Sequence, residues 1–357
     1  MIHRSRITEA SAWEPTDLMA DASWHLELTD QETADLRAAL DGTRQQGLRL
    51  EEINQGNFPL PHCQGVIEKI KQQLANGFGF ALLRGFPIEA HEREDIAKMY
   101  WGLCCHLGLG LTQNGDGTLI HYVTEGHLRP SQGTRGVGNP GKVSLHVDLA
   151  DCVSLLCIHQ PPSSPQSHVA SSTTIHNKLL QRDPALLERL YEGFVWDRQN
   201  EHGPSETATS AYRVPVFSQR DGFVSCRYNR NWMRRAADRQ GGFSEEDTAL
   251  LDTFDELANE SRFAFDFEPG DIQFVNNYTI LHGREPHPPA TNEEEIRLLM
   301  RIWFDLDEPR PMWDEAIIRY GIIRHGRLGW TARDLITGLE SKTHARRPED
   351  LAPLIEA

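Results

Sequence analysis

The chain has few of the features that mark disulfide-rich, zinc-ribbon or nucleic-acid-binding proteins. Its 357 residues include only six cysteines, and no two of them form a CxxC pair, so neither a disulfide framework nor a zinc ribbon is expected. Basic residues are also scarce, because 36 Lys and Arg stand against 52 Asp and Glu and leave a formal net charge of −16. A surface of this charge argues against partners such as nucleic acids or anionic membranes.

Long apolar runs are missing as well. No uninterrupted run is long enough to span a bilayer, and residues 1–10 lack the apolar segment of a signal peptide. Most of the cysteines lie in apolar segments, where a reduced and buried thiol is the expected state. We therefore expect a cytoplasmic protein that binds neither nucleic acid nor membrane.

One imidazole and one carboxylate lie two residues apart in the strand-like run of residues 144–149. Alternate side chains of a strand share a face, so His146 and Asp148 are expected to point into one cavity. A third donor, His282, stands at the end of a second apolar run, residues 274–284, which predicts another strand. Two histidines and one carboxylate form the facial triad of non-haem Fe(II) oxygenases, which leaves three coordination positions open.

Residues 297–304 predict a core strand that carries two arginines. On a strand, Arg297 and Arg301 share a face with Leu299. A guanidinium group on a cavity wall is costly unless an anion pairs with it, and its planar fork suits a carboxylate. A dicarboxylate cosubstrate would satisfy one of the two.

The order of these residues carries a family resemblance. His146-x-Asp148, then His282, then Arg297 fifteen residues later resembles the taurine dioxygenase and clavaminate synthase-like family of Fe(II)/2-oxoglutarate dioxygenases. The similarity covers roughly residues 60–306, by our comparison of motifs. Besides the ligands it includes the segments 79–85, 146–151, 171–177, 276–277 and 281–284.

The resemblance implies a mainly β fold with flanking helices and a double-stranded β-helix, or jelly-roll, core. No Pro/Gly/Ser-rich linker divides the chain, so we expect a single catalytic domain over residues 1–357. Within it we expect a mixed α/β N-terminal layer at 1–110, the jelly-roll core with helical insertions at 111–310 and a C-terminal extension at 311–357. A stretch rich in Gly, Asn, Ser and Pro from Gln113 to Lys142 predicts a loop.

For the cofactors, the resemblance implies Fe(II) and 2-oxoglutarate. The arginine that matches Arg297 holds the distal carboxylate of 2-oxoglutarate in this family, and a hydroxyl at the position of Ser167 assists it. The Gly-Gly pair and acidic residue that usually precede this hydroxyl are replaced here by Ser164-Pro165-Gln166.

For the substrate, the pattern names three candidate contacts. Arg301 matches a position that contacts the acidic group of the substrate in family members acting on sulfonates or carboxylates. Asn114 and Arg230 lie in polar loops, where solvated side chains are the alternative interpretation. We therefore expect hydroxylation, or another oxidation, of a small, anionic or amino-acid-derived metabolite, with release of succinate and CO₂.

Two other classes share parts of the pattern. A zinc-dependent hydrolase can hold its metal with the same three ligands and activate a water molecule, but it has no need for a buried arginine after the last histidine. A non-catalytic jelly-roll binding protein would adopt the same fold without turning over 2-oxoglutarate. Metal analysis and a 2-oxoglutarate assay separate these alternatives.

Overall fold

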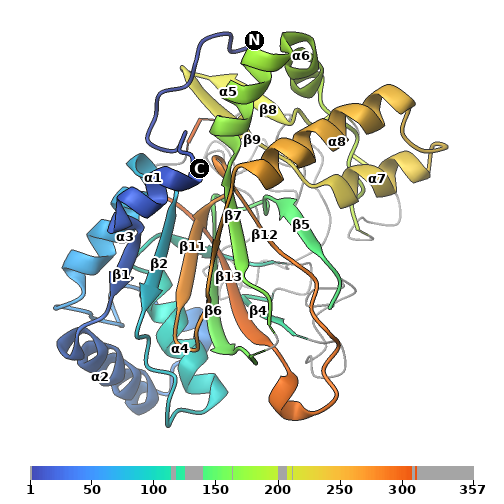
Figure 1. Cartoon of the computed structure of the whole chain (residues 1–357). Coiled ribbons are helices and arrows are strands. Elements are labelled where there is room, and N and C mark those ends of the chain that lie inside the picture. The colour runs from blue at the N-terminus through green and yellow to red at the C-terminus, as the bar shows by residue number, and fades with distance from the viewer. Residues whose placement is uncertain are drawn as a thin grey trace.

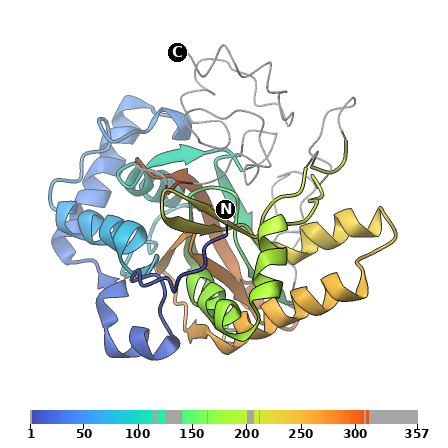
Figure 2. The ribbon, with the colours of Figure 1, turned by 90° about the horizontal axis from the view of Figure 1, so that it is seen from above.

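The computed structural model of the chain describes residues 2–113, 118–124, 140–162, 164–199, 207–210, 212–307 and 310–311. Two β-sheets form its centre, and helices surround them (Figure 1). Seen from above, the helices of the N-terminal third lie on one side of the sheets and the later helices on the other (Figure 2).

The larger sheet has seven strands in the order β1-β2-β11-β6-β13-β3, and β4 also pairs with β13. Its only parallel pair among the described strands is β1 with β2. The strands are β1 (His25–Glu27), β2 (Phe80–Arg84), β3 (Leu109–Leu111), β4 (Ile120–Val123), β6 (Cys152–His159), β11 (Ile272–Asn276) and β13 (Leu298–Asp305).

The smaller sheet has four antiparallel strands in the order β10-β7-β12-β5. They are β5 (Val143–His146), β7 (Ser167–Ser171), β10 (Arg262–Phe265) and β12 (Ile280–Arg284). A separate two-stranded ribbon consists of β8 (Phe217–Arg220) and β9 (Phe223–Cys226).

Two groups of helices cover the sheets. The first comprises α1 (Pro15–Ala20), α2 (Asp30–Gln46), α3 (Gln64–Asn76) and α4 (Arg93–Cys104). The second, at the top of Figure 1, comprises α5 (Ser172–Arg182), α6 (Pro184–Glu192), α7 (Arg230–Asp238) and α8 (Glu245–Glu260). Short 3₁₀ turns lie at Ala22–Trp24, Leu50–Glu52 and Glu293–Glu295. Among the described residues, no helix combines the length and the apolar character needed to cross a membrane.

Strand alternation builds the core on both faces of the larger sheet. Phe80 and Leu82 of β2 belong to a buried cluster that also contains Leu281 of the smaller sheet, so they pack between the sheets. Their neighbours Ala81 and Leu83 belong to a second cluster, formed with the helices α2 to α4. Because β2 and β13 are apolar on both faces, the smaller sheet covers one face of these strands and the helices cover the other.

The same alternation decides what β13 presents to the space between the sheets. Leu299 and Trp303 belong to the cluster between the sheets, whereas Met300 and Ile302 face the helices. Arg301 is in phase with Leu299 and Trp303 and therefore shares their face. The predicted mainly β, jelly-roll fold with flanking helices is thus confirmed, and strands from the predicted N-terminal layer join the core sheet.

Two sequence-based boundaries were wrong. The predicted loop from Gln113 to Lys142 contains β4, because residues 120–123 find hydrogen-bonding partners along β13. The predicted single strand at 274–284 is two strands, β11 and β12, in different sheets. The side chain of Asn276 accepts a hydrogen bond from the Tyr278 amide at 2.9 Å, and this local bond turns the chain between the sheets.

Candidate active site

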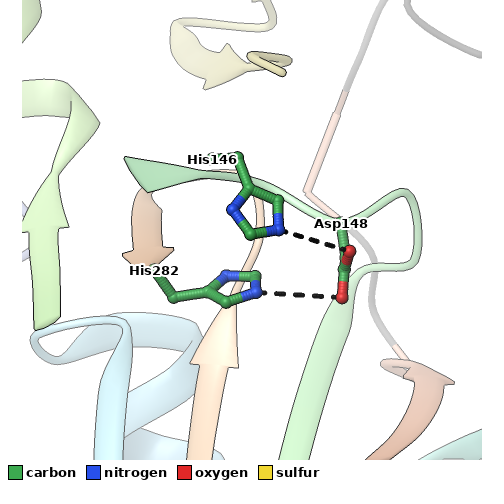
Figure 3. A group of neighbouring side chains, drawn as sticks. All are labelled: His146, Asp148 and His282. Carbon is green, nitrogen blue, oxygen red and sulfur yellow. Dashed lines mark ion pairs between the residues drawn. The ribbon is translucent and has the colours of Figure 1, made fainter. Parts of the chain in front are cut away.

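The three predicted metal ligands lie together between the sheets. His146 ends β5, His282 lies in the middle of β12, and the two residues are directly paired in the antiparallel register. Their rings are 4.4 Å apart, centroid to centroid. Asp148 faces both imidazoles (Figure 3), and the three residues each offer one donor atom within 4.8 Å of the others.

Asp148 reaches this position by a turn and not, as expected, by strand alternation. The strand β5 ends at His146. The Val147 amide donates to the Tyr228 carbonyl at 2.9 Å, and the Asp148 amide donates to Oδ1 of Asn277 at 3.0 Å. The chain leaves the sheet because these partners lie outside it, yet the carboxylate still converges on His146.

The distances and proton positions fit a metal ion. Nε2 of His146 is 3.9 Å from Oδ1 of Asp148, and Nε2 of His282 is 3.8 Å from Oδ2. Both separations exceed a hydrogen bond but allow one ion to contact each donor at about 2 Å. Nδ1 of His146 lies 2.9 Å from the Ser144 carbonyl. Because a carbonyl can only accept, Nδ1 carries the proton and Nε2 keeps its lone pair for the metal.

The charges of the three ligands suit the same role. Burial, together with the charge of His146, lowers the pKa of His282 to about 3, so its imidazole is neutral at neutral pH. Burial alone would raise the pKa of Asp148, but the Arg301 guanidinium, with the hydrogen bond from Trp303, outweighs it and holds that pKa below its usual range. The site therefore offers two imidazoles and one carboxylate, the set that Fe(II) oxygenases use.

Two residues of β13 orient the Asp148 carboxylate. Its Oδ2 accepts from Nε1 of Trp303 at 2.8 Å and from Nη1 of Arg301 at 3.2 Å. Arg301 also donates from Nε to Oε1 of Gln113 at 2.7 Å, and its guanidinium lies 4.9 Å from the Trp303 ring centroid. Sequence reasoning missed Trp303, although its position two residues after Arg301 placed it on the same face of the strand.

Arg297 is a second buried arginine near the triad. Its Nε donates to Oε1 of Gln160 at 2.9 Å, and it forms no ion pair with any acidic side chain in the described part of the chain. Burial, followed by the charge of Arg284, lowers the pKa of Arg297 to about 10. Ser167 is buried and lies opposite Arg284 in the β7–β12 register. Sequence reasoning gave Arg284 no role, although it lies two residues after His282.

One cavity of about 510 Å³ lies at this site. It is lined by the triad and by Ser167, Arg297, Arg301 and Arg230. Arg230 is held at its rim by ion pairs of 2.6 Å to Asp252 and to Asp255. Asn114, the third candidate substrate contact, lies outside the described residues.

Comparisons with known proteins agree with this site. Residues 43–303 match the model of the family described as "Taurine catabolism dioxygenase TauD, TfdA family". The chain is 30% identical over 321 residues to FR-33289 synthase of Streptomyces rubellomurinus (strain ATCC 31215), covering 87% of this chain and 93% of the relative.

Two solved structures share the fold. One is asparagine oxygenase in complex with Fe(II), 2S,3S-3-hydroxyasparagine and succinate, with a TM-score of 0.61, 15% identity and coverage of 79% of this chain and 93% of that one. The other is the non-heme iron oxygenase OrfP with Fe and alpha-ketoglutaric acid, with a TM-score of 0.55, 14% identity and coverage of 79% and 94%. With its His-Asp-His site, the chain belongs to the TauD/TfdA dioxygenase family and is an Fe(II)- and 2-oxoglutarate-dependent oxygenase.

Proposed function

We propose that this oxygenase hydroxylates a small, anionic, amino-acid-derived metabolite. The balanced reaction inserts one atom of O₂ into a substrate C–H bond and converts 2-oxoglutarate to succinate and CO₂. The observation that carries the proposal is the shared cavity, in which a triad of two histidines and one carboxylate lies beside a buried arginine that no described acid neutralises.

The metal end of the cavity has defined roles. His146, Asp148 and His282 hold Fe(II), which supplies the oxidising chemistry once 2-oxoglutarate and O₂ are bound. Trp303 and Arg301 fix one oxygen of Asp148. Fixing this oxygen keeps the carboxylate in the orientation that the metal requires.

The cosubstrate end works by charge. Arg297 binds the distal carboxylate of 2-oxoglutarate, and the Ser167 hydroxyl donates a hydrogen bond to the same carboxylate. The buried guanidinium is desolvated before binding, so a carboxylate that arrives there forms a charge-assisted pair in a medium of low dielectric constant. This pair orients the cosubstrate so that its other end points toward the triad.

The substrate assignment rests on the cavity and on one neighbour. Asparagine oxygenase carries a hydroxylated amino acid in its crystal, which supports an amino-acid-derived substrate here. Arg301 and Arg230 border the substrate space, and Asn114 is retained with them as a candidate contact. We further propose that the chain is a single catalytic domain and that it acts in the cytoplasm, where its six free cysteines would stay reduced.

The zinc-hydrolase alternative explains less of the cavity. Among the described lining residues, Asp148 is the only acid, so no second carboxylate is present there to act as a general base. A hydrolase also has no use for Arg297. A binding protein without catalysis would not need a triad with its carboxylate locked by two donors.

A screen for substrate-stimulated succinate formation tests the proposal. The enzyme is incubated with Fe(II), 2-oxoglutarate and air, together with panels of amino acids, their acidic derivatives and neutral metabolites. We expect succinate to rise with at least one anionic amino-acid derivative and a product 16 Da heavier to appear. His282→Ala serves as the inactive control. Stimulation by Zn(II) alone, with hydrolysis products and no succinate, would overturn the proposal.

A further inference from the structure

The cavity is far more basic than the chain as a whole. Seven of its lining residues are Lys or Arg and one is acidic, whereas the whole chain carries a net charge of −16. The seven are Lys142, Arg230, Arg234, Arg235, Arg284, Arg297 and Arg301. A concentration of positive charge in a cleft of an acidic protein attracts anions selectively.

Four of the seven have partners or roles already. Arg301 is ion-paired with Asp148, and Arg230 is ion-paired with two acids of α8. Arg284 donates from Nη1 to the carbonyls of Gly141 and Glu285. Arg297 is reserved for 2-oxoglutarate in the proposed function.

The other three have no dedicated acid. Arg235 donates to the neutral Oε1 of Gln199 at 2.7 Å, and Arg234 donates to the neutral Oδ1 of Asn231 at 3.3 Å. Within the described ranges, neither these two arginines nor Lys142 forms an ion pair. Lys142 interacts electrostatically with Glu285, but that carboxylate is held by Arg262 at 2.5 Å.

The three cations stand at the open end of the cavity. All three side chains are exposed although they line it. Arg234 and Arg235 come from α7, and Lys142 immediately precedes β5. Figure 1 shows α7 and β5 on the same side of the molecule. The metal ligand His146 lies at the other end of β5. A substrate that extends from the triad toward the exposed part of the cavity would therefore pass these three cations.

We infer that Arg234, Arg235 and Lys142 bind an oxyanionic group at the distal end of the primary substrate, with two negative charges preferred over one. This inference rests on the proposed function for the position of the reacting carbon. Phosphate and phosphonate have the favoured chemistry, because two guanidinium forks and an ammonium group together supply more charge than one carboxylate can neutralise. The inference also moves substrate-anion recognition away from Arg301, whose guanidinium holds an iron ligand.

The test measures binding instead of turnover. Protein loaded with Fe(II) and 2-oxoglutarate without oxygen is titrated by ligand-observed NMR with propylphosphonate, butanoate and 1-butanol. These probes have similar chains, and near pH 8 propylphosphonate carries between one and two negative charges, butanoate one and 1-butanol none. We expect affinity to fall in that order. In Arg234→Gln/Arg235→Gln, propylphosphonate should bind at least about tenfold more weakly, given the usual strength of charged hydrogen bonds.

Two further variants complete the design. Arg37→Gln/Arg182→Gln removes the same two charges from exposed positions outside the cavity and should bind all three probes like the wild type. Arg234→Lys/Arg235→Lys keeps the charges and should retain most of the propylphosphonate affinity, which excludes a folding defect at α7. Circular dichroism of all variants checks the fold.

Three results would overturn the inference. They are equal binding of the charged and neutral probes by the wild type, wild-type affinity in the α7 glutamine variant, and an equal loss in the control pair. Each of them leaves the proposed function standing if the wild type forms succinate with any metabolite. Failure to form succinate with any metabolite, in turn, would overturn the proposed function while the probe affinities are still measurable.

Discussion

The indole Nε1 of Trp303 donates to Oδ2 of Asp148 across 2.8 Å, and thereby connects β13 of the larger sheet to the metal ligand that follows β5. Arg301, two residues earlier, donates to the same oxygen at 3.2 Å. The two histidine ligands come from the smaller sheet. The metal centre is therefore assembled across the two sheets, and its carboxylate is oriented by the sheet that carries neither histidine.

The first prediction concerns this link. Trp303→Phe keeps the aromatic packing but removes one of the two donors to Oδ2, so the Asp148 carboxylate gains rotational freedom. Fe(II) affinity should fall roughly tenfold to a hundredfold, the usual effect of losing a group that orients a metal ligand. Anaerobic titration of the apoprotein with Fe(II) measures the change directly.

Trp101→Phe is the matched control for this variant. Trp101 is equally buried, and its Nε1 donates to the Ile53 carbonyl at 3.2 Å in the helical layer. Both variants lose one indole hydrogen bond in the interior, but only Trp303 contacts the metal site. Equal Fe(II) affinities of the two variants would show that Trp303 has no role in orienting Asp148.

The second prediction concerns the triad itself. A metal ion that binds the folded state and not the unfolded chain raises the melting temperature, and the rise grows with the logarithm of the metal concentration divided by Kd. Mn(II), used because it resists oxidation in air, should raise Tm of the wild type but not of His282→Ala, and chelation should reverse the rise. Without metal, the two proteins should melt within a few degrees of each other, since roughly 1 kcal/mol shifts Tm by about 1–2 °C at this size, from an unfolding entropy of about 2.1 cal/mol/K per residue. A metal-dependent shift of wild-type size in His282→Ala would exclude His282 as a ligand.

The third prediction concerns the cosubstrate. Arg297→Gln removes the buried guanidinium and should weaken 2-oxoglutarate binding roughly tenfold to a hundredfold or more, from about 1.5–3 kcal/mol for a charged hydrogen bond. Arg297→Lys should recover only part of this loss, because an ammonium group lacks the fork that matches a carboxylate. Arg182→Gln, at an exposed position of α5, should leave the affinity unchanged. A Michaelis constant for 2-oxoglutarate unaltered by both Arg297 variants would contradict the assignment.

The ligands could be predicted from the sequence because their chemistry is carried by residue type and order. Two histidines and an HxD spacing are visible without a fold, and strand alternation placed Leu299 and Arg301 on one cavity wall. Arg297 lines the same cavity, but it precedes β13 and a register shift follows it, so alternation does not account for its position. Alternation is a local property, so it survives errors elsewhere. It failed at Asp148, where a tertiary hydrogen bond from the Asp148 amide to Asn277 overrides the extended backbone.

The partners of the arginines could not be predicted, because they depend on how distant elements pack. Arg230 was selected as a polar loop residue, and the structure places it at the start of α7, paired with acids of α8. Arg301 was expected to contact the acidic group of the substrate, whereas its observed partner is Asp148. To predict each pairing, one must know how far apart two elements lie in the fold, and no sequence pattern gives this distance.

The last prediction is a dependence of stability on pH that arises away from the cavity. His176 of α5 is fully buried, and its Nε2 lies 2.9 Å from the Tyr191 hydroxyl. Burial, with a smaller effect of His3, lowers the pKa of His176 to about 3.

In the unfolded chain this imidazole has a pKa near 6.5. Below that pH the unfolded state therefore binds a proton that the folded state does not bind. The contribution of His176 to stability is therefore intact above pH 6.5 and is lost as the pH falls toward 3, at about 1.4 kcal/mol per unit. In His176→Gln, whose amide can still reach Tyr191, the drop in unfolding free energy between pH 7 and pH 5 should be about 2 kcal/mol smaller than in the wild type. Urea unfolding at the two pH values measures it, with His25→Gln at an exposed position of β1 as the control. An identical drop in the wild type and in His176→Gln would mean that His176 does not contribute to acid destabilisation.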